Sequence, residues 1–374
     1  MAPAVVEEES IMTIDELKKA AAAKMSPTVR AYYNGGSMQM LTLKENEAAF
    51  DRFKIRPRIL TDVSEVDTST TILGSKVALP FGFGPAAMHC LAHPDGEKAS
   101  SRAAASKRIP MGLSTYSTVS IEDVRREGGD NPYAFQLSIV KDRSTTLAWI
   151  KRAEAAGYNA LFITVDAPVL GRRLNEKDGK KFELPEHLSL PNLAPQATAS
   201  GQTAGARSYH TNGRDPSVSW QSAIPWVKQN TKLEIWLKGV YTPADVQLAI
   251  RYGLDGVIIS NHGGRQLDGV PATIDALAEC APAASGQIKI GLDGGIRRGT
   301  DIFKALALGA DFCFLGRVPL WGLAYGGQAG VERAVSILED ELRLAMALSG
   351  CASVRDITRE HVSVIGANGL LCKL

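Results

Sequence analysis

The sequence predicts an α/β fold, a single (β/α)8 TIM barrel preceded by short N-terminal helices. Eight short apolar runs recur along the chain, most of them about 23–32 residues apart, and helical stretches that end in glycine separate them. Runs that are apolar throughout are typical of parallel strands covered on both faces. Nearly every run ends in a polar residue, which a purely structural barrel would not need. A doubly wound parallel sheet is the competing architecture, but it does not require eight strands.

The N-terminal segment, residues 11–55, predicts three short helices. Each has a start signal: a capping box, or a proline in the first helical turn. These signals are Thr13 with Glu16, Ser26 with Pro27, and Thr42 with Glu45. Gly35 and Gly36 are expected to end the second helix.

The barrel is expected at about 77–365, within one domain that spans 1–374. Its strands are predicted in runs that begin at Val77, Ile109, Tyr133, Asn159, Leu233, Asp255, Gln287 and Asp311. One interval is much longer, because a loop of about 174–218, rich in Pro, Ser, Ala and Thr, separates the fourth and fifth runs. A loop of this kind is usually an active-site lid or a disordered segment.

The composition excludes several classes of protein. Hydrophobic residues make up 45% and charged residues 22%, which is typical of a folded globular chain. The net charge of +2 argues against a nucleic-acid binder or a polybasic membrane-surface protein. Five scattered cysteines without a C-x-x-C pair favour a reducing compartment and no metal site. No signal peptide or long apolar stretch is present, so we expect a soluble, intracellular protein.

Two glycine-rich loops have the composition of a phosphate site. They are Asp293–Gly299 after the seventh run, with Gly294, Gly295 and Arg297, and Gly316 with Arg317 after the eighth. The loops after these two strands are where such barrels bind phosphate, together with a helix N-terminus. Glycine lets backbone amides approach the oxygens, and arginine forms bidentate contacts. Tight turns with surface arginines are the alternative interpretation.

A candidate base, His262, follows the sixth run, three residues before Arg265. Histidine is the natural base at neutral pH, and an arginine beside it would hold an anionic substrate. Asp166, after the fourth run, could orient the histidine and stabilise its imidazolium, while Arg173 could bind a carboxylate. Lys238 ends the fifth run, where a lysine would face solvent or an anion. The alternatives are a structural histidine, a helix-capping aspartate and a solvated arginine.

Two segments together resemble one family. SNHGGRQLD (260–268) and LDGGIRRGTDIFKALALGA (292–310) are similar to the FMN-dependent α-hydroxy acid oxidases and dehydrogenases, which include glycolate oxidase, lactate oxidase and the flavin domain of flavocytochrome b2. The resemblance covers essentially the whole chain. It implies that FMN lies across the barrel mouth and that Lys238 stabilises the anionic reduced flavin. The implied FMN-binding residues are Pro85, Ala86, Ala87, Ser114, Gln136, Thr164, Lys238, Ser260, Asp293, Gly294, Gly295, Arg297, Gly316 and Arg317.

The resemblance also implies a reaction, the oxidation of an L-2-hydroxy acid to the 2-oxo acid. His262 would be the base, oriented by Asp166, and Tyr32, Arg173 and Arg265 would hold the substrate carboxylate. With only about 60 residues before the barrel, no haem-binding module is expected, so O2 is the expected electron acceptor and H2O2 the product. A homo-oligomer, a tetramer or octamer, is implied as well.

Three positions differ from the family pattern. Ser138 stands where most relatives have a tyrosine that touches substrate, Tyr116 where glycolate oxidases often have tryptophan, and Ala86 where threonine is common. The smaller Ser138 predicts a wider pocket and argues against glycolate. A bulkier substrate, such as a cyclic amino or imino acid, is therefore an alternative.

Two other functions are kept open. A nucleotide-converting barrel related to inosine monophosphate dehydrogenase shares the phosphate loops but needs a catalytic cysteine, and we find none at a strand exit. A non-catalytic flavin-binding barrel is compatible with Ser138.

The C-terminal residues Cys372, Lys373 and Leu374 resemble the peroxisomal signal Ser-Lys-Leu. The preceding Gly366–Gly369 is expected to be flexible and to leave this tail exposed. We therefore expect a peroxisomal protein, with the cytoplasm as the alternative if the ending arose by chance.

Overall fold

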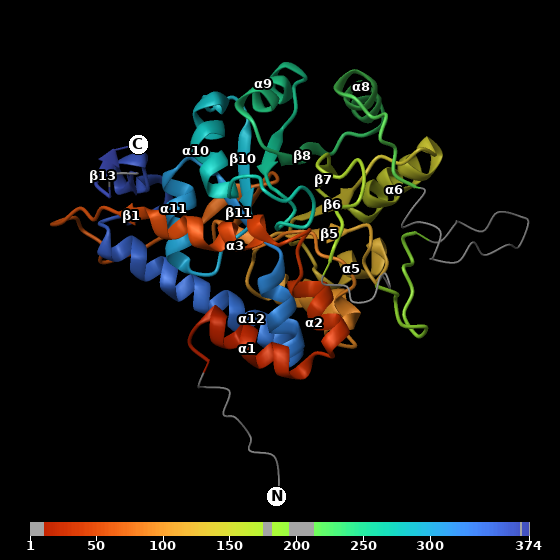
Figure 1. Ribbon diagram of the computed structural model, residues 1–374, viewed down its shortest axis with the longest axis horizontal. Helices are drawn as coiled ribbons and strands as arrows, with labels where there is room; N and C mark the ends of the chain where they lie inside the picture. Colours follow the sequence, from red (N-terminus) through yellow and green to blue (C-terminus); the bar gives the residue numbers. More distant parts are fainter. Residues whose placement is uncertain (1–10, 175–181, 194–212, 367–368, 374) are drawn as a thin grey trace, which may run out of the picture.

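Eight parallel strands close into a barrel at the centre of the molecule (Figure 1). The computed structural model describes residues 11–174, 182–193, 213–366 and 369–373. The strands follow one another around the barrel as β10-β11-β4-β5-β6-β7-β8-β9, and all neighbouring pairs are parallel. They are β4 (Phe81–Phe83), β5 (Met111–Ser114), β6 (Tyr133–Leu137), β7 (Ala160–Thr164), β8 (Glu234–Val240), β9 (Gly256–Ile259), β10 (Lys289–Asp293) and β11 (Phe312–Leu315). The predicted (β/α)8 barrel is confirmed.

One strand boundary differs from the prediction. The first predicted run, from Val77, is divided in the structure: Val77 ends the short strand β3, and the barrel strand begins at Phe81. Pro80, which has no amide hydrogen to donate to a neighbouring strand, lies between them.

Helices surround the barrel on the outside (Figure 1). They are α4 (Gly96–Ser106), α5 (Ile121–Glu127), α6 (Arg143–Ala156), α8 (Trp220–Asn230), α9 (Pro243–Arg251), α10 (Thr273–Ala284), α11 (Gly299–Ala307) and α12 (Arg317–Leu348). The helical stretch predicted before Gly157 is α6, and Gly157 adopts a left-handed φ of +81° as its C-cap. In α12, Gly326 and Gly327 interrupt the helical backbone.

The barrel interior is filled by alternate residues of each strand. Ala160 and Phe162 of β7 belong to an inner apolar cluster, whereas Leu161 and Ile163 pack in the outer core between strands and helices. The ring of Phe162 packs against those of Trp236 and Phe314, with centroids 6.0 and 5.1 Å apart. A hairpin of β2 (Thr70–Ile72) and β3 (Ser75–Val77) adds apolar side chains to this inner cluster. Its turn lies near Glu234, the first residue of β8, at the N-terminal end of the barrel strands.

The N-terminal helices are α1 (Ile14–Lys24), α2 (Pro27–Asn34) and α3 (Leu41–Ala48). Thr13 and Glu16 form the predicted capping box of α1. Ser26 caps α2, and Gly35 is its C-cap, also as predicted. A 3-10 turn, Ala49–Arg52, and strand β1 (Phe53–Ile55) follow α3.

The predicted cap of the third helix is wrong. α3 begins at Leu41, so Thr42 lies inside the helix, and the residue at the cap position is Met40 in a left-handed conformation. The Oδ1 atom of Asp268 accepts a hydrogen bond of 2.9 Å from the amide of Thr42 instead. The Oγ1 atom of Thr42 in turn accepts from the amide of Gly269, at 2.9 Å. A distant loop therefore satisfies the start of this helix, which sequence spacing did not predict.

The remaining strands lie outside the barrel. β12 (Val362–Ile365) pairs antiparallel with both β1 and β13 (Leu371–Lys373). Short 3-10 turns occupy His89–Leu91, Val354–Asp356 and Arg359–His361. Among the described residues, no helix is both long and apolar enough to cross a membrane.

We predict that the Asp268 contact stabilises the folded chain. Asp268→Ala removes the acceptor for the Thr42 amide and should lower the free energy of unfolding by about 1 kcal/mol, the usual worth of an N-cap. Asp268→Asn keeps a side-chain oxygen, so its free energy of unfolding should differ from that of the parent by only a few tenths of 1 kcal/mol. Chemical denaturation of the three proteins measures both effects, and equal stability of the parent and Asp268→Ala would contradict the assignment.

Candidate active site

A cavity of about 1170 Å³ opens at the C-terminal end of the barrel strands. Seventeen of the nineteen predicted site residues line it, and they come from every barrel strand exit and from α2. The other two, Asp166 and Ser260, are in contact with His262 and Lys238, which do line the cavity. The structure thus brings the whole predicted set together.

The floor of the cavity continues the inward-facing rows of the barrel. Thr164 lies two residues beyond Phe162, and Lys238 two beyond Trp236, so both side chains face the interior one layer higher. The Nε2 atom of Gln136 donates a 2.9 Å hydrogen bond to the Oγ1 atom of Thr164. An apolar barrel is thereby covered by a polar layer that could hydrogen-bond a flat polar ring.

Lys238 is a buried cation with fixed partners. Its Nζ atom lies 3.2 Å from the Oδ2 atom of Asp293 and donates a 3.0 Å hydrogen bond to the Oγ atom of Ser260. Burial alone would lower the pKa of Lys238, but the carboxylates of Asp293 and Asp166 outweigh it and raise that pKa. The lysine therefore keeps its positive charge at the cavity wall.

His262 and Asp166 form a close pair. The Nδ1 atom of His262 is 3.0 Å from one carboxylate oxygen of Asp166 and 3.2 Å from the other. Burial lowers the pKa of His262; Asp166 opposes this, while Lys238 and Arg265 lower it further. Burial alone would raise the pKa of Asp166, but the imidazole and Lys238 bring it below its ordinary value. The pair is thus a neutral imidazole held by an ionised carboxylate, the arrangement that a general base requires.

Two backbone features bring this pair together. A β-bulge in β8 lies at Gly239, where φ is +108° and a Cβ atom would overlap the side chain of Asp166. His262 itself has a φ of +57°, which is uncommon for a residue with a Cβ atom, and its amide donates to the Oγ atom of Ser260 at 3.1 Å. Only glycine at position 239 lets the loop that carries Asp166 pack this closely against β8.

Two arginines and a tyrosine form the anion-binding wall. The guanidinium groups of Arg173 and Arg265 lie 5.6 and 5.0 Å from the centre of the Tyr32 ring. Arg265 also donates 2.6 and 3.3 Å hydrogen bonds to the carbonyls of Tyr32 and Gly35 at the end of α2. This helix end is thereby attached to the loop that carries the base.

The glycine-rich loops follow β10 and β11, next to β9 and the loop that carries His262. Gly295 has a φ of +82°, and a Cβ atom there would overlap the carbonyl of Asn46. Arg297 pairs with Glu47 at 2.6 Å, but its buried Nε atom has no hydrogen-bond partner among the described residues. Arg297 lines the cavity, and a guanidinium nitrogen without an acceptor in a cavity-lining arginine is consistent with a site for an anion.

The helix terminus that could bind the phosphate is that of α12. The start of α11 is satisfied internally, because Asp301 accepts from the amides of Arg297 and Arg298, and Glu341 accepts from Gly299. α12 has no side-chain cap, and the space above Gly316 is open. An uncapped helix start beside a cavity is a ready anion site.

Arg317 makes contacts that the sequence did not indicate. Its guanidinium donates to the carbonyls of Tyr33, Gly263 and Gly35, at 2.9, 3.0 and 2.9 Å. Burial lowers the pKa of Arg317 to about 9, and the neighbouring cations Arg265 and Arg297 contribute to that shift. Arg317 therefore attaches α2 to the barrel and lies in a cluster of cations that a bound anion would stabilise.

Sequence reasoning missed three residues around the cavity. Gln266 donates to the carbonyls of Asp166 and Val169, and thereby links the base loop to the loop that carries its partner. The ring of Phe182, from the long loop, stacks on Tyr32 with centroids 4.3 Å apart. Arg214, from the end of the same loop, contacts Ser138. Gln266 lies inside the SNHGGRQLD segment, whereas the other two had no local signal.

Comparison with known proteins agrees with this geometry. Residues 21–364 match the family model of FMN-dependent dehydrogenases. The chain is 50% identical to "Oxidase FUB9" of Fusarium oxysporum f. sp. lycopersici, over 99% of this chain and 96% of the relative. It is 46% identical to glycolate oxidase 3 of Arabidopsis thaliana, over 94% and 96%. The structure of mandelate oxidase with (S)-4-hydroxymandelic acid superposes with a TM-score of 0.86 at 37% identity, covering 93% of this chain and 98% of that one.

The residues present fit FMN. The orphaned Nε atom of Arg297 and the open helix start at Gly316 suit its phosphate. The polar layer of Gln136, Thr164 and Lys238 suits the polar edge of its ring. Hydrogen-bonding side chains and one buried cation are the groups that such a ring needs.

We predict that Arg297 holds the cofactor phosphate. Arg297→Met should weaken FMN binding about 10- to 100-fold, because a hydrogen bond to a charged group is worth about 1.5–3 kcal/mol. Glu47→Gln, which breaks the 2.6 Å ion pair but keeps the guanidinium, is the matched control and should bind FMN at least as tightly as the parent. Quenching of FMN fluorescence during titration of the apoprotein measures the affinities. Equal affinity for Arg297→Met and the parent would exclude the contact.

Proposed function

The chain belongs to the FMN-dependent dehydrogenase family, and we propose that it oxidises an L-2-hydroxy acid to the 2-oxo acid and passes the electrons to O2, releasing H2O2. Its class, an FMN-dependent oxidoreductase, follows from the family. One observation carries the rest: a neutral imidazole paired with a carboxylate faces the same cavity as two arginines. Relatives named as oxidases support O2 as the acceptor.

Substrate binding is assigned to the anion-binding wall. Arg173 and Arg265 hold the carboxylate, and the hydroxyl of Tyr32 adds a hydrogen bond to it. Both arginines contact the same tyrosine ring, so the carboxylate has one fixed position relative to His262. The 2-carbon of the substrate then lies between the base and the polar floor of the cavity.

The proton moves to His262. Its Nδ1–H donates to Asp166, so the Nε2 atom carries the lone pair and takes the proton that leaves the substrate. Asp166 stabilises the imidazolium that forms, as the carboxylate of a catalytic triad does. Bound FMN would supply the acceptor for the two electrons and for the second of the two hydrogens that the substrate loses. Lys238 supplies the positive charge beside the polar ring edge.

A second candidate substrate is a bulkier cyclic amino or imino acid. Ser138 supports it, because a short side chain stands where the family pattern has a tyrosine. The similarity to proteins named only as oxidases is compatible with it. Such a substrate would use the same carboxylate wall and the same base. It would lose its hydrogens from a ring C–H and N–H, where a hydroxy acid loses them from C–H and O–H.

Anaerobic mixing separates these possibilities. The yellow holoenzyme is mixed without oxygen with L-2-hydroxy acids of graded chain length and with cyclic amino acids, and bleaching of the flavin is recorded. Bleaching by hydroxy acids, followed by reoxidation and peroxide formation when O2 is admitted, is the expected result. Bleaching by cyclic amino acids alone would favour the second candidate, and no bleaching by any compound would favour a non-catalytic flavin barrel.

We predict that flavin reduction depends on the neutral form of His262. Because the pKa of His262 is lowered from 6.5, the reduction rate should be constant near neutral pH and fall as the pH drops below 6.5. Asp166 raises that pKa, so Asp166→Asn should move the acid limb to lower pH and reduce the plateau about 10²–10⁴-fold. Asp142→Asn, which changes an exposed helix cap, should leave both unchanged. Stopped-flow reduction between pH 4.5 and about 8 measures the limb, and an acid limb that moves to higher pH in Asp166→Asn would contradict the pairing.

The single-domain organisation over 1–374 and a homo-oligomer of four or eight chains remain part of the proposal. The FMN site is built from one chain, so cofactor binding itself does not require a partner. Light scattering of the holoenzyme gives its mass directly.

We propose that the protein is peroxisomal, with the cytoplasm as the alternative. Cys372 and Lys373 are exposed but pair with β12, and Leu374 and part of Gly366–Gly369 lie outside the described residues. A receptor that reads the last three residues would have to detach a strand of only three residues, Leu371–Lys373.

Two fusion proteins expressed in a eukaryotic cell test the targeting. A fluorescent protein fused to the N-terminus should mark peroxisomes, and deletion of the last three residues should return it to the cytosol. A diffuse signal from the intact fusion would exclude the peroxisomal assignment.

A further inference from the structure

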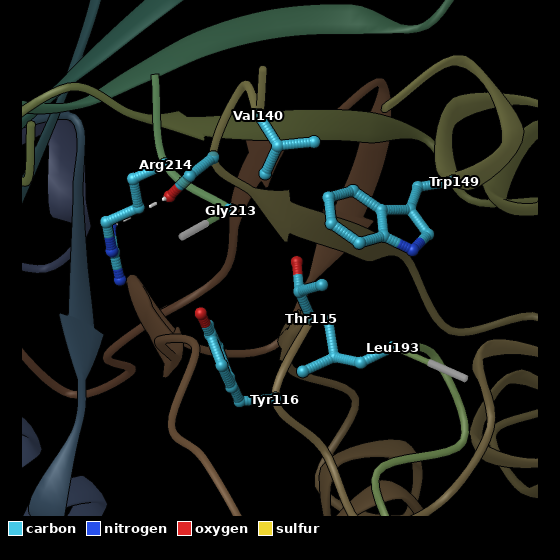
Figure 2. A pocket seen from close by; sticks show the side chains of 8 residues that line it. Thr115, Tyr116, Val140, Trp149, Leu193, Gly213 and Arg214 are labelled. Atoms are coloured by element: carbon cyan, nitrogen blue, oxygen red, sulfur yellow. Dashed lines mark hydrogen bonds between the residues drawn. The ribbon is translucent and has the colours of Figure 1, made fainter. Parts of the chain in front are cut away.

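A cationic side chain lies where Ser138 leaves room in the cavity. The Nη1 atom of Arg214 donates to the carbonyl of Ala167 at 3.0 Å and contacts the Oγ atom of Ser138 at 3.4 Å. A β-bridge between Arg214 and Val140 fixes the backbone beside the exit of β6. Figure 2 shows the guanidinium of Arg214 and the phenol of Tyr116 on the same side of a small pocket, with their polar ends toward each other.

Arg214 has no acidic partner in the described part of the chain. The neighbouring Asp215 pairs with Arg143 instead, at 3.1 Å. The Nε atom of Arg214 is buried and donates to no acceptor among the described residues, although its side chain lines the large cavity. A buried guanidinium nitrogen without an acceptor is costly, so the site favours a ligand that supplies one.

Tyr116 lies between Arg214 and the anion-binding wall of Tyr32, Arg173 and Arg265. Burial raises the pKa of Tyr116, and the charge of Arg214 and a hydrogen bond from it oppose that increase. Tyr32 lies close enough to Tyr116 to affect the same pKa, so Tyr116 adjoins the residues proposed to hold the substrate carboxylate. Ser138, Tyr116 and Arg214 together form one corner of the cavity, the distal corner.

The distal corner lies across the barrel mouth from the base. Tyr116 follows β5 and Ser138 follows β6, whereas His262 and Arg265 follow β9. β5 and β9 are four positions apart in a closed ring of eight, which places them on opposite sides. All these residues line one cavity. A substrate that is held by Arg265 and His262 and also reaches Arg214 would therefore span this cavity.

We propose that Arg214 is a specificity-determining residue that binds a second acidic group at the far end of the substrate. The preferred class is then a 2-hydroxy dicarboxylic acid, or a related acid with a carboxylate beyond the reacting carbon. This inference rests on the proposed function, because the reacting end is placed by His262, Arg173 and Arg265. Arg214 acts by binding and takes no part in the proton or electron transfer.

Equilibrium binding tests the proposal without turnover. 2-Oxoglutarate and 2-oxopentanoate have the same chain length and the same 2-oxo acid end, and differ in a terminal carboxylate against a methyl group. Their affinities for the oxidised holoenzyme are measured from the perturbed flavin absorbance at constant ionic strength. The parent should bind 2-oxoglutarate at least about tenfold more tightly, as expected for a charged hydrogen bond that is gained.

The variants assign that preference to one side chain. Arg214→Met keeps most of the volume and should remove the preference, while affinity for 2-oxopentanoate stays within about twofold. Lys141→Met is the matched control, because Lys141 is an exposed cation that lines the same cavity, and it should keep the preference. An unchanged preference in Arg214→Met, or a loss of equal size in Lys141→Met, would overturn the proposal. If Arg214→Met does not fold, Ser138→Tyr, whose ring would enter the space beside Arg214, must reduce the preference, and an unchanged ratio there would overturn it too.

Flavin reduction by L-2-hydroxyglutarate and L-2-hydroxypentanoate separates this inference from the proposed function. Reduction by both acids at equal efficiency in the parent and in Arg214→Met would leave the oxidase function intact and refute the role of Arg214. No reduction by either acid, together with an Arg214-dependent binding preference, would refute the proposed oxidation and leave the distal acid site intact.

Discussion

The alternation of side chains along the parallel strands determines which residues face the cavity at the mouth of this barrel. Phe162 and Trp236 fill the interior, so Thr164 and Lys238, two residues farther on, must face the same interior one layer higher. At that height no further apolar layer covers them, and they form the floor of the cavity. A slip of one residue in β8 would turn Lys238 toward the helices and place Leu237 under the cavity. The bulge at Gly239 comes after Lys238, and thus changes the strand's path without disturbing this register.

The charges of the site serve two purposes at once. Arg265 and Lys238 are suited to binding a carboxylate and a polar ring edge, and both also lower the pKa of His262. The cations to which we assign substrate and cofactor binding therefore also favour the neutral form of His262. Asp166 acts in the opposite direction, which limits that effect and prepares the site for the imidazolium. The same crowding of positive charge, acting on Arg317 beside Arg265 and Arg297, favours an anion next to the glycine-rich loops.

The sequence predicted the barrel and the meeting of His262 with Asp166 because each leaves a local trace. Buried parallel strands are apolar throughout, and His262 and Asp166 follow such strands directly, so their meeting at one end of the barrel could be expected. Apart from the strand boundary at Pro80, the errors concern contacts between distant segments. Asp268 satisfies α3 from another loop, which no spacing near Thr42 could indicate. The carbonyls that engage Arg317 likewise become acceptors only after α2 has packed on the barrel. Tertiary contacts of this kind have no sequence period, and so a pattern does not predict them.

The residues to which we assign the chemistry and those to which we assign substrate choice lie on different parts of this fold. The base, its carboxylate and Lys238 stand on or next to strands, where alternation and register restrict them. The far side of the cavity is lined by residues of the long crossover between β7 and α8, which can change without disturbing a strand. The small side chain of Ser138 and the long side chain of Arg214 fit each other in size. A tyrosine at position 138, as in the family pattern, would project into the space beside the Arg214 guanidinium, whereas serine leaves room for it and contacts it. The position that follows β6 and the end of the long crossover therefore shape this part of the pocket together.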